Sequence, residues 1–251
     1  MAYKKEKDLV TSADIAVQKL CLKLIKENFP HAGIVAEEKF SCKCTDSDND
    51  YYFVLDPLDG TKAYGRRQSH SIASMVAFVF EGEICGVAVA DVMSREVYYS
   101  RPDSDKVHRI SDYSIVEELR INPRKHLRQQ HIQLRKDPRD HSEFIQIATR
   151  SRKGLFKGVE VTGGSIGSMF ARLWKGEVGA VVLEPGIEMP WDITPVMGLS
   201  ERLGFVLLMQ KDYGYKKVAF SPSKKSQRFA GETLIIHESR VDEFIDYFQR
   251  L

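Results

Sequence analysis

The chain has 251 residues, of which 43% are hydrophobic and 29% are charged, and its net charge is +2. A chain of this length buries a substantial core, as one large domain or as two closely packed halves. The near-balance of charge supplies no global field that would attract nucleic acid or a membrane surface. No run approaches the ~20 apolar residues of a membrane span. No apolar segment follows the N-terminal charges, which predicts that a signal peptide is absent.

Two local features favour a cytoplasmic protein that does not bind nucleic acid. Cys42 and Cys44 lack the second pair of ligands that a zinc site usually needs, and Cys21 and Cys85 lie among apolar neighbours. Such thiols are typical of a reducing compartment. The basic stretch 120–139 is interrupted by prolines and contains no Phe, Tyr or Trp for base stacking, which favours a solvated face over a nucleic-acid arm.

The first half of the chain combines one helix with several strands. Apolar spacing predicts a helix over residues 14–28, which the oxygens of Thr11 and Asp14 would cap. The polar residues 39–50 predict a loop. Short turns between the β-rich runs after residue 70 predict an antiparallel meander. The predicted strands cover residues 33–36, 51–55, 71–80, 83–91 and 96–100.

The second half alternates helices and strands. Residues 102–140 are polar and show no clear period, and residues 115–119 fit either a short helix or a strand. From residue 144 onward the apolar runs become regular, and a mixed α/β pattern follows. The predicted strands cover residues 144–148, 159–162, 179–183, 205–209, 218–220 and 233–237. The predicted helices cover residues 166–174, 192–203 and 241–248.

The most informative segment is Asp56-Pro57-Leu58-Asp59-Gly60-Thr61, which directly follows the apolar run 51–55. Asp, Pro and Gly after a strand are ordinary turn residues, so a simple turn is one interpretation. A metal site is the other, because Mg²⁺ is usually shared between protein carboxylates and a substrate phosphate. Taken alone, the segment fits both.

Acidic residues stand at the ends of predicted elements in three further places. Asp14 lies at a helix start, Glu37 and Glu38 follow a strand, and Asp192 follows Trp191 at another helix start. Singly, each place is explained by a helix cap or a solvated turn. Carboxylates brought together from these places would repel one another strongly, so they would hold cations or protons.

Taken in order, these segments resemble the inositol monophosphatase family, the lithium-sensitive Mg²⁺-dependent phosphatases. The similarity extends over residues 8–210, and the family pattern is Asp, Glu-Glu, Asp-Pro-Ile/Leu-Asp-Gly-Thr and Trp-Asp-x-x-Ala. Here it stands as Asp14, Glu37-Glu38, residues 56–61 and Trp191-Asp192-Ile193-Thr194-Pro195. Two departures are visible. Pro195 replaces a small residue, close to the first helical turn where proline is tolerated. The family's extra N-terminal helix is reduced to a short charged stub, which leaves dimer packing open.

The resemblance implies a fold and a metal site. The fold is a layered αβαβα sandwich of the α+β or α/β class, with an antiparallel sheet in residues 1–130 and a mixed sheet in residues 131–251, forming one catalytic unit. Two or three Mg²⁺ ions are implied, for which Mn²⁺ can substitute. The implied ligands are the side chains of Glu37, Asp56, Asp59 and Asp192 and the backbone carbonyl of Leu58.

The resemblance also implies catalytic and substrate-binding residues. Asp14 and Thr61, together with Glu37, would orient and deprotonate a metal-activated water for direct attack. The loop that contains Ser165 resembles the family's polyol-binding loop, although close packing at a helix start explains its glycines equally well. Glu184 and Glu188 compete to bind the polyol hydroxyls. The implied substrate contacts are Asp59, Gly60, Thr61, Ser165, Gly167, Ser168, Glu184 and Asp192.

The implied function is hydrolysis of a small phosphomonoester, with inositol 1-phosphate or a related sugar or polyol phosphate as the leading substrate. One alternative is a 3′(2′),5′-bisphosphate nucleotidase, of which a lysine directly after the motif, here Lys62, is typical. Another is a fructose-1,6-bisphosphatase. An alternative of another class is a non-catalytic regulatory protein with the same fold. We expect lithium inhibition, a homodimer, a cytoplasmic location and no nucleic-acid or membrane partner.

Overall fold

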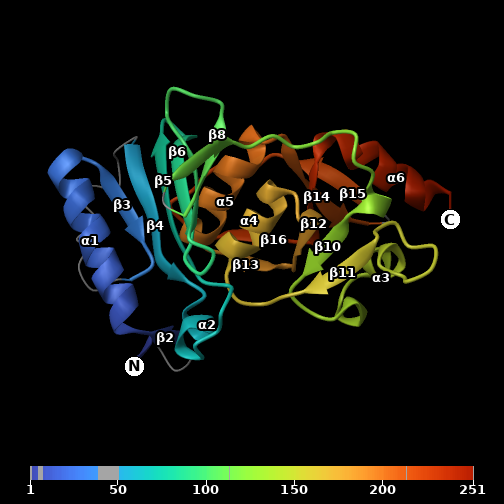
Figure 1. Cartoon of the computed structure of the whole chain (residues 1–251), viewed down its shortest axis with the longest axis horizontal. Helices are drawn as coiled ribbons and strands as arrows, with labels where there is room; N and C mark the ends of the chain where they lie inside the picture. The colour runs from blue at the N-terminus through green and yellow to red at the C-terminus, as the bar shows by residue number, and fades with distance from the viewer. Residues whose placement is uncertain (1, 5–7, 39–50, 113, 213, 251) are drawn as a thin grey trace.

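Five layers of secondary structure follow one another along the long axis of the molecule, in the order helix, sheet, helices, sheet, helices (Figure 1). The computed structural model describes all residues except 1, 5–7, 39–50, 113, 213 and 251. The layers confirm the αβαβα sandwich that the sequence predicts. The loop predicted over residues 39–50 lies outside the described residues.

The first sheet has seven strands that lie side by side in chain order. They are β3 (Gly33–Ala36), β4 (Tyr51–Asp59), β5 (Ala73–Phe80), β6 (Glu83–Asp91), β7 (Glu96–Ser100), β8 (Val107–Ser111) and β9 (Ile115–Glu118). β3 and β4 pair in parallel and each later pair is antiparallel, which confirms the predicted meander. β4 is buried almost throughout, because helices cover both faces of the sheet at this strand. Residues 115–118, left open between helix and strand, form the edge strand.

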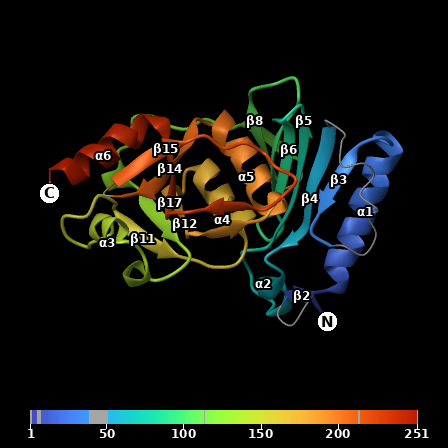
Figure 2. The ribbon, with the colours of Figure 1, turned by 180° about the vertical axis from the view of Figure 1, so that it is seen from behind.

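Helix α1 (Ser12–Asn28) covers the outer face of this sheet, as the views from both sides show (Figures 1 and 2). It confirms the helix predicted over residues 14–28. Thr11 and Asp14 form a capping box, in which each side chain accepts a hydrogen bond from the other's backbone N–H. Leu22 and Ile25 pack with Phe53 of β4 in a small apolar core. A short antiparallel pair, β1 (Ala2–Lys4) and β2 (Asp8–Val10), precedes the helix.

The second sheet has six strands in the order β11-β10-β12-β17-β14-β15. Their bounds are β10 (His131–Leu134), β11 (Gly158–Val161), β12 (Val178–Leu183), β14 (Phe205–Lys211), β15 (Gly214–Val218) and β17 (Thr233–His237). β10 is parallel to both of its neighbours, and the remaining pairs are antiparallel, so the sheet is mixed as predicted. A separate two-stranded ribbon pairs β13 (Gly186–Glu188) with β16 (Gln227–Phe229).

Helices α4 (Ile166–Lys175) and α5 (Pro190–Arg202) form the layer between the sheets and pack against both. α4 is buried on nearly all sides, since each of its faces meets other elements of the core. A Cβ on Gly167 would lie 2.8 Å from the Ala73 Cβ, so glycine permits the close approach of this helix to β5. α5 begins two residues earlier than predicted, which puts Pro195 inside the helix rather than close to its first turn.

Two predictions for the second half of the chain are wrong. Residues 144–148, predicted as a strand, form helix α3 (Glu143–Ala148), which begins where the Ser142 hydroxyl accepts a hydrogen bond from the backbone N–H of Ile145 (3.4 Å). The strand predicted over residues 218–220 is wrong as well, because β15 ends at Val218. Helix α6 (Val241–Gln249) completes the layer as predicted. Single 3₁₀ turns occur at Leu127–Gln129, Pro138–Asp140 and Glu238–Arg240. Among the described helices, none is both long and apolar enough to cross a bilayer.

Candidate active site

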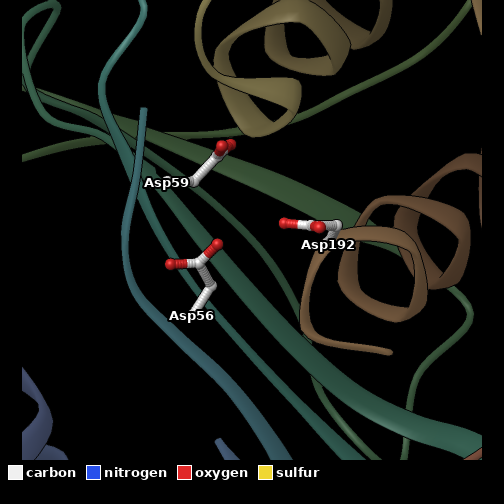
Figure 3. Close-up of side chains that lie close together, drawn as sticks. All are labelled: Asp56, Asp59 and Asp192. Atoms are coloured by element: carbon white, nitrogen blue, oxygen red, sulfur yellow. The ribbon is translucent and has the colours of Figure 1, made fainter. Parts of the chain in front are cut away.

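Three aspartates that are far apart in the sequence meet where β4 ends and α5 begins. Asp56 and Asp59 lie at the end of β4, and Asp192 lies in the first turn of α5. Carboxylate oxygens of the three residues lie within 4.8 Å of one another. Figure 3 shows the Asp192 side chain facing the two aspartates of the strand. The pairing of β4 with β5 shifts between Asp56 and Asp59, so both carboxylates reach the same side.

The electrostatics of this cluster favour a bound cation. Burial, followed by the charges of Asp59 and Glu37, raises the pKa of Asp56 well above its ordinary value. Burial, again with Asp59 and Glu37, raises the pKa of Asp192 to about 8. Carboxylates in this state hold protons unless another positive charge replaces them. Clustered carboxylate oxygens are the hard donors that divalent cations such as Mg²⁺ prefer, so this donor set fits a metal.

Two further predicted ligands lie beside the aspartates. Glu37 follows β3 and is half-buried, and both its charge and a hydrogen bond act on Asp56. The backbone N–H of Leu58 donates to the Asp56 carboxylate (3.0 Å), while its carbonyl accepts the Thr61 hydroxyl (3.0 Å). Because a carbonyl oxygen has two lone pairs, the second remains suited to a metal. The ligand set predicted from the sequence is therefore brought to one place.

Asp14 and Thr61 also meet, across 47 positions of the chain. The Thr61 hydroxyl lies 3.0 Å from one oxygen of the Asp14 carboxylate and 3.0 Å from the Leu58 carbonyl, so its single proton is shared between these two acceptors. The other carboxylate oxygen accepts the backbone N–H of Thr11 (2.8 Å) and the Thr11 hydroxyl. Asp14 is fully buried, so its orientation is fixed from both sides. The helix-cap contacts of Asp14 and its contact with Thr61 therefore involve the same side chain.

The loop before α4 binds the aspartate cluster. The Ser165 hydroxyl (2.6 Å) and the backbone N–H of Gly167 (2.7 Å) both donate to one oxygen of Asp59. These bonds oppose the effect of burial, which still leaves the Asp59 pKa above its ordinary value. The N-terminus of a helix attracts an acidic side chain, which explains why this contact forms. Ser168 donates its backbone N–H to Ser165 (2.9 Å) and lines a smaller cavity with Gln133.

A cavity of about 570 Å³ opens over Glu37 and Thr61. Gly60 lines it with φ 90°, where an added Cβ would lie 2.3 Å from the Ser71 carbonyl oxygen. Glu184 also lines it and pairs with Lys136 at 2.5 Å. The full lining is Glu37, Gly60, Thr61, Lys62, Arg66, Arg135, Lys136, Gly164, Glu184, Pro185, Gly186 and Glu188.

The family comparison agrees with this geometry. The inositol monophosphatase family model matches residues 2–228 of the chain. The chain belongs to the inositol monophosphatase family. "Nus factor SuhB" of Escherichia coli K12 is 32% identical over 97 residues, which cover 39% of this chain and 35% of that protein. The aligned part thus spans about a third of the curated relatives it matches.

Solved structures of the family share the whole fold. An "IMPase/NADP phosphatase complexed with Mg2+ and phosphate" is 18% identical and superimposes with a TM-score of 0.70, covering 98% of this chain and 84% of that one. The "extragenic suppressor protein suhB from Bartonella henselae" is 16% identical with a TM-score of 0.71, covering 99% and 89%. At these identities the likeness establishes the inositol monophosphatase fold.

Several residues of this family member were not identified from the sequence. Gln18 of α1 binds both backbone groups of Glu38, accepting its N–H at 2.9 Å and donating to its carbonyl, and so holds the segment that carries Glu37. Helical spacing alone places Gln18 on the buried side but does not show this contact. Arg66, Arg135 and Lys136 line the cavity together with Lys62, which was singled out from the sequence only for the nucleotidase alternative. The four-residue spacing of Lys62 and Arg66 is a visible signal, whereas residues 131–134 were not assigned as a strand.

Proposed function

We propose that the protein is a Mg²⁺-dependent phosphomonoesterase, and that inositol 1-phosphate or a related sugar or polyol phosphate is its reference substrate. The observation that carries this proposal is the meeting of two groups at one end of β4. One is the cluster of Asp56, Asp59 and Asp192, and the other is the hydrogen-bonded pair of Asp14 and Thr61. Metal binding and proton transfer are both needed to attack a phosphate ester with water.

Five groups of the site are suited to metal binding. Glu37, Asp56, Asp59 and Asp192, with the Leu58 carbonyl, would hold the metal. Bound magnesium would supply positive charge to the phosphate oxygens and activate a water molecule.

Proton transfer belongs to the hydrogen-bonded pair. Asp14 accepts the Thr61 hydroxyl, and its second oxygen is held by Thr11. We infer that the Thr61 oxygen thereby orients a water molecule and that Asp14 takes up the proton. Direct attack by water needs no covalent intermediate with the protein. Gly60 and Thr61, which line the cavity floor, would face the scissile phosphate.

The predicted contacts of Ser165, Gly167 and Ser168 with the substrate remain a proposal, to which the structure adds a second possible role. We propose that Ser165 and Gly167 act by holding Asp59, because both donate to its carboxylate, and that any contact with the polyol is secondary. Glu184 and Glu188 both line the cavity and remain candidates for the alcohol side of the substrate.

The test is phosphate release from inositol 1-phosphate with and without Mg²⁺, alongside adenosine 3′,5′-bisphosphate and fructose 1,6-bisphosphate. We expect turnover that EDTA abolishes, Mn²⁺ partly restores and Li⁺ inhibits. Asp105→Asn, in an exposed loop, is the matched control for substitutions of the aspartate cluster. A folded protein that releases phosphate from none of the three esters would refute the proposal and support the non-catalytic alternative. The complete ligand set favours an enzyme over that alternative.

We further propose a homodimer in the cytoplasm, with no nucleic-acid or membrane partner, and a division near residue 130 between the two halves of one catalytic unit. The two main sheets support this division, because β3 to β9 come from residues 33–118 and β10 to β17 from residues 131–237. Sedimentation of the purified protein tests the dimer. A monomer at micromolar concentration would contradict it.

A further inference from the structure

The buried face of helix α1 changes character along its length. Asp14 is fully buried and Gln18 is 2% exposed, and the two lie four positions apart, about one helical turn, on the same face. The next buried positions of this face, Leu22 and Ile25, are apolar and pack with Phe53. Polar side chains are therefore confined to the half of the buried face that lies beside the acidic strand ends.

The Gln18 amide takes the place of a neighbouring strand just beyond the end of β3. Its oxygen accepts the backbone N–H of Glu38 (2.9 Å), and its nitrogen donates to the Glu38 carbonyl. One residue earlier, the backbone N–H of Glu37 donates to the Leu55 carbonyl of β4 (3.2 Å). The segment that follows β3 is thus bound to β4 through one residue and to α1 through the next.

This double contact determines where the Glu37 carboxylate lies. A primary amide carries one donor and one acceptor, so a single glutamine can satisfy both backbone groups of one residue. The Glu37 side chain in turn acts on Asp56 through its charge and through a hydrogen bond. Loss of the Gln18 amide would leave both Glu38 backbone groups without this partner and would free the segment to move away from the aspartate cluster.

We propose that Gln18 is a positioning residue for the metal site, and that α1 fixes the metal ligand Glu37 and the proton acceptor Asp14 relative to each other. This inference rests on the proposed phosphomonoesterase function and adds a residue that acts through Glu38. Asp14 binds Thr61 after β4, and Gln18 binds the residue after Glu37, so one helix holds the ends of both strands. Removal of an outer partner that orients a metal ligand typically costs ~10- to 100-fold in metal affinity.

A purely structural role for Gln18 has a matched comparison in the second half of the chain. Gln130 is also buried, at 3% exposure, and its amide nitrogen donates to the backbone carbonyls of Lys125 (2.9 Å) and His126 (3.3 Å). It lines a separate cavity beside Trp174. If burial and backbone hydrogen bonds were the whole contribution, substitutions of the two glutamines would have the same effects.

The test compares Gln18→Met with Gln130→Met, because methionine keeps the length and flexibility of glutamine and removes the amide. Calorimetric titration of Mg²⁺ into the substrate-free protein measures metal affinity, and phosphate release measures activity. Both variants should lose several degrees of Tm. Only Gln18→Met should bind Mg²⁺ more weakly, by ~10-fold or more. Saturating Mg²⁺ should restore its kcat to within ~3-fold of the wild type, since the contact between Asp14 and Thr61 is retained.

A second variant, Gln18→Asn, keeps the amide but shortens its reach by one methylene group, and it should weaken Mg²⁺ binding by ~3-fold or more. Wild-type Mg²⁺ affinity in either folded Gln18 variant would overturn the positioning role and leave the phosphomonoesterase function standing. An equal loss of affinity in Gln130→Met would overturn it as well, because general loosening of the fold would then explain the effect. Gln18-dependent Mg²⁺ binding in a protein that hydrolyses no phosphomonoester would support the positioning role and refute the proposed function.

Discussion

Replacement of Asp192 by asparagine has a predictable effect that reverses with metal. Two unit charges 4.8 Å apart repel by about 3.5 kcal/mol at an effective dielectric constant of about 20, and Asp192 faces both Asp56 and Asp59. The protein limits this repulsion by retaining protons, since burial and its neighbours raise the Asp192 pKa to about 8. The folded state then binds more protons than the unfolded state, so metal-free stability falls as pH rises from about 4 to about 8.

We therefore expect Asp192→Asn to be more stable than the wild type at pH 8.5 in EDTA, by about 1–2 kcal/mol or roughly 2–8 °C in Tm. At pH 5, where the wild-type cluster holds protons, the difference should shrink. Saturating Mg²⁺ should raise the wild-type Tm and raise that of the variant much less. Phosphatase activity of the variant should fall at least ~10²-fold, as on removal of one positioned electrostatic group.

Thermal unfolding at two pH values, with EDTA or with Mg²⁺, measures the stability effects, and phosphate release measures the loss of activity. Asp105→Asn should behave as the wild type in every arm, because its side chain is exposed in a loop. A variant that is less stable than the wild type in EDTA at pH 8.5 would refute the charge-repulsion argument. An undiminished Tm gain of the variant with Mg²⁺ would refute a separate point, namely that Asp192 is a metal ligand.

Three other substitutions test separate parts of the site. Thr61→Val removes the hydroxyl that donates to Asp14 and should lower kcat at least ~10²-fold with little change in Tm, whereas Thr61→Ser should retain most activity. Ser165→Ala removes a 2.6 Å hydrogen bond to Asp59 and should weaken Mg²⁺ activation by ~10-fold. It should also lower the free energy of unfolding by about 1 kcal/mol as a lost N-cap. Mg²⁺ titrations of activity at fixed substrate measure the first effect, and thermal unfolding measures the second. Gly60→Ala puts a Cβ 2.3 Å from a backbone carbonyl oxygen at φ 90° and should lower Tm by several degrees, as differential scanning fluorimetry would show.

The long elements of the fold were predictable because their apolar periods extend over several turns. α1, α4 and α5 occur within two residues of their predicted bounds. The run 144–148 was wrong because five residues are too few to separate a helical period from that of a strand. What decides it is the preceding Ser142, which caps the helix and is itself held by Glu232, 90 positions later.

The core of the site was predictable for a different reason. Each acidic side chain stands at the end of a strand or at the start of a helix, and such ends meet at the edge of a sheet. The role of Ser165 was not predictable, since a helix cap, a polyol contact and a bond to Asp59 all use the same hydroxyl. In the structure this hydroxyl both caps α4, by accepting the Ser168 N–H, and donates to the Asp59 carboxylate at 2.6 Å. The hydrogen bonds of Gln18 and Arg135 likewise reach partners distant in the chain, so local sequence patterns do not show them.

The amino-acid sequence alone was sufficient to place the chain in its family, because oxygen-rich residues stand in a specific order along it. The tertiary structure decided which of those oxygens lie close together, which hydrogen bonds orient them and which cations line the cavity. Contacts between residues tens of positions apart depend on how two sheets and two buried helices pack, and local sequence patterns carry no record of that packing. The segment 56–61 thus contributes carboxylates that local patterns already indicate, whereas their meeting with Asp192 and the lining of the cavity by residues near α2 (Thr61–Gly65) and β10 depend on the packing.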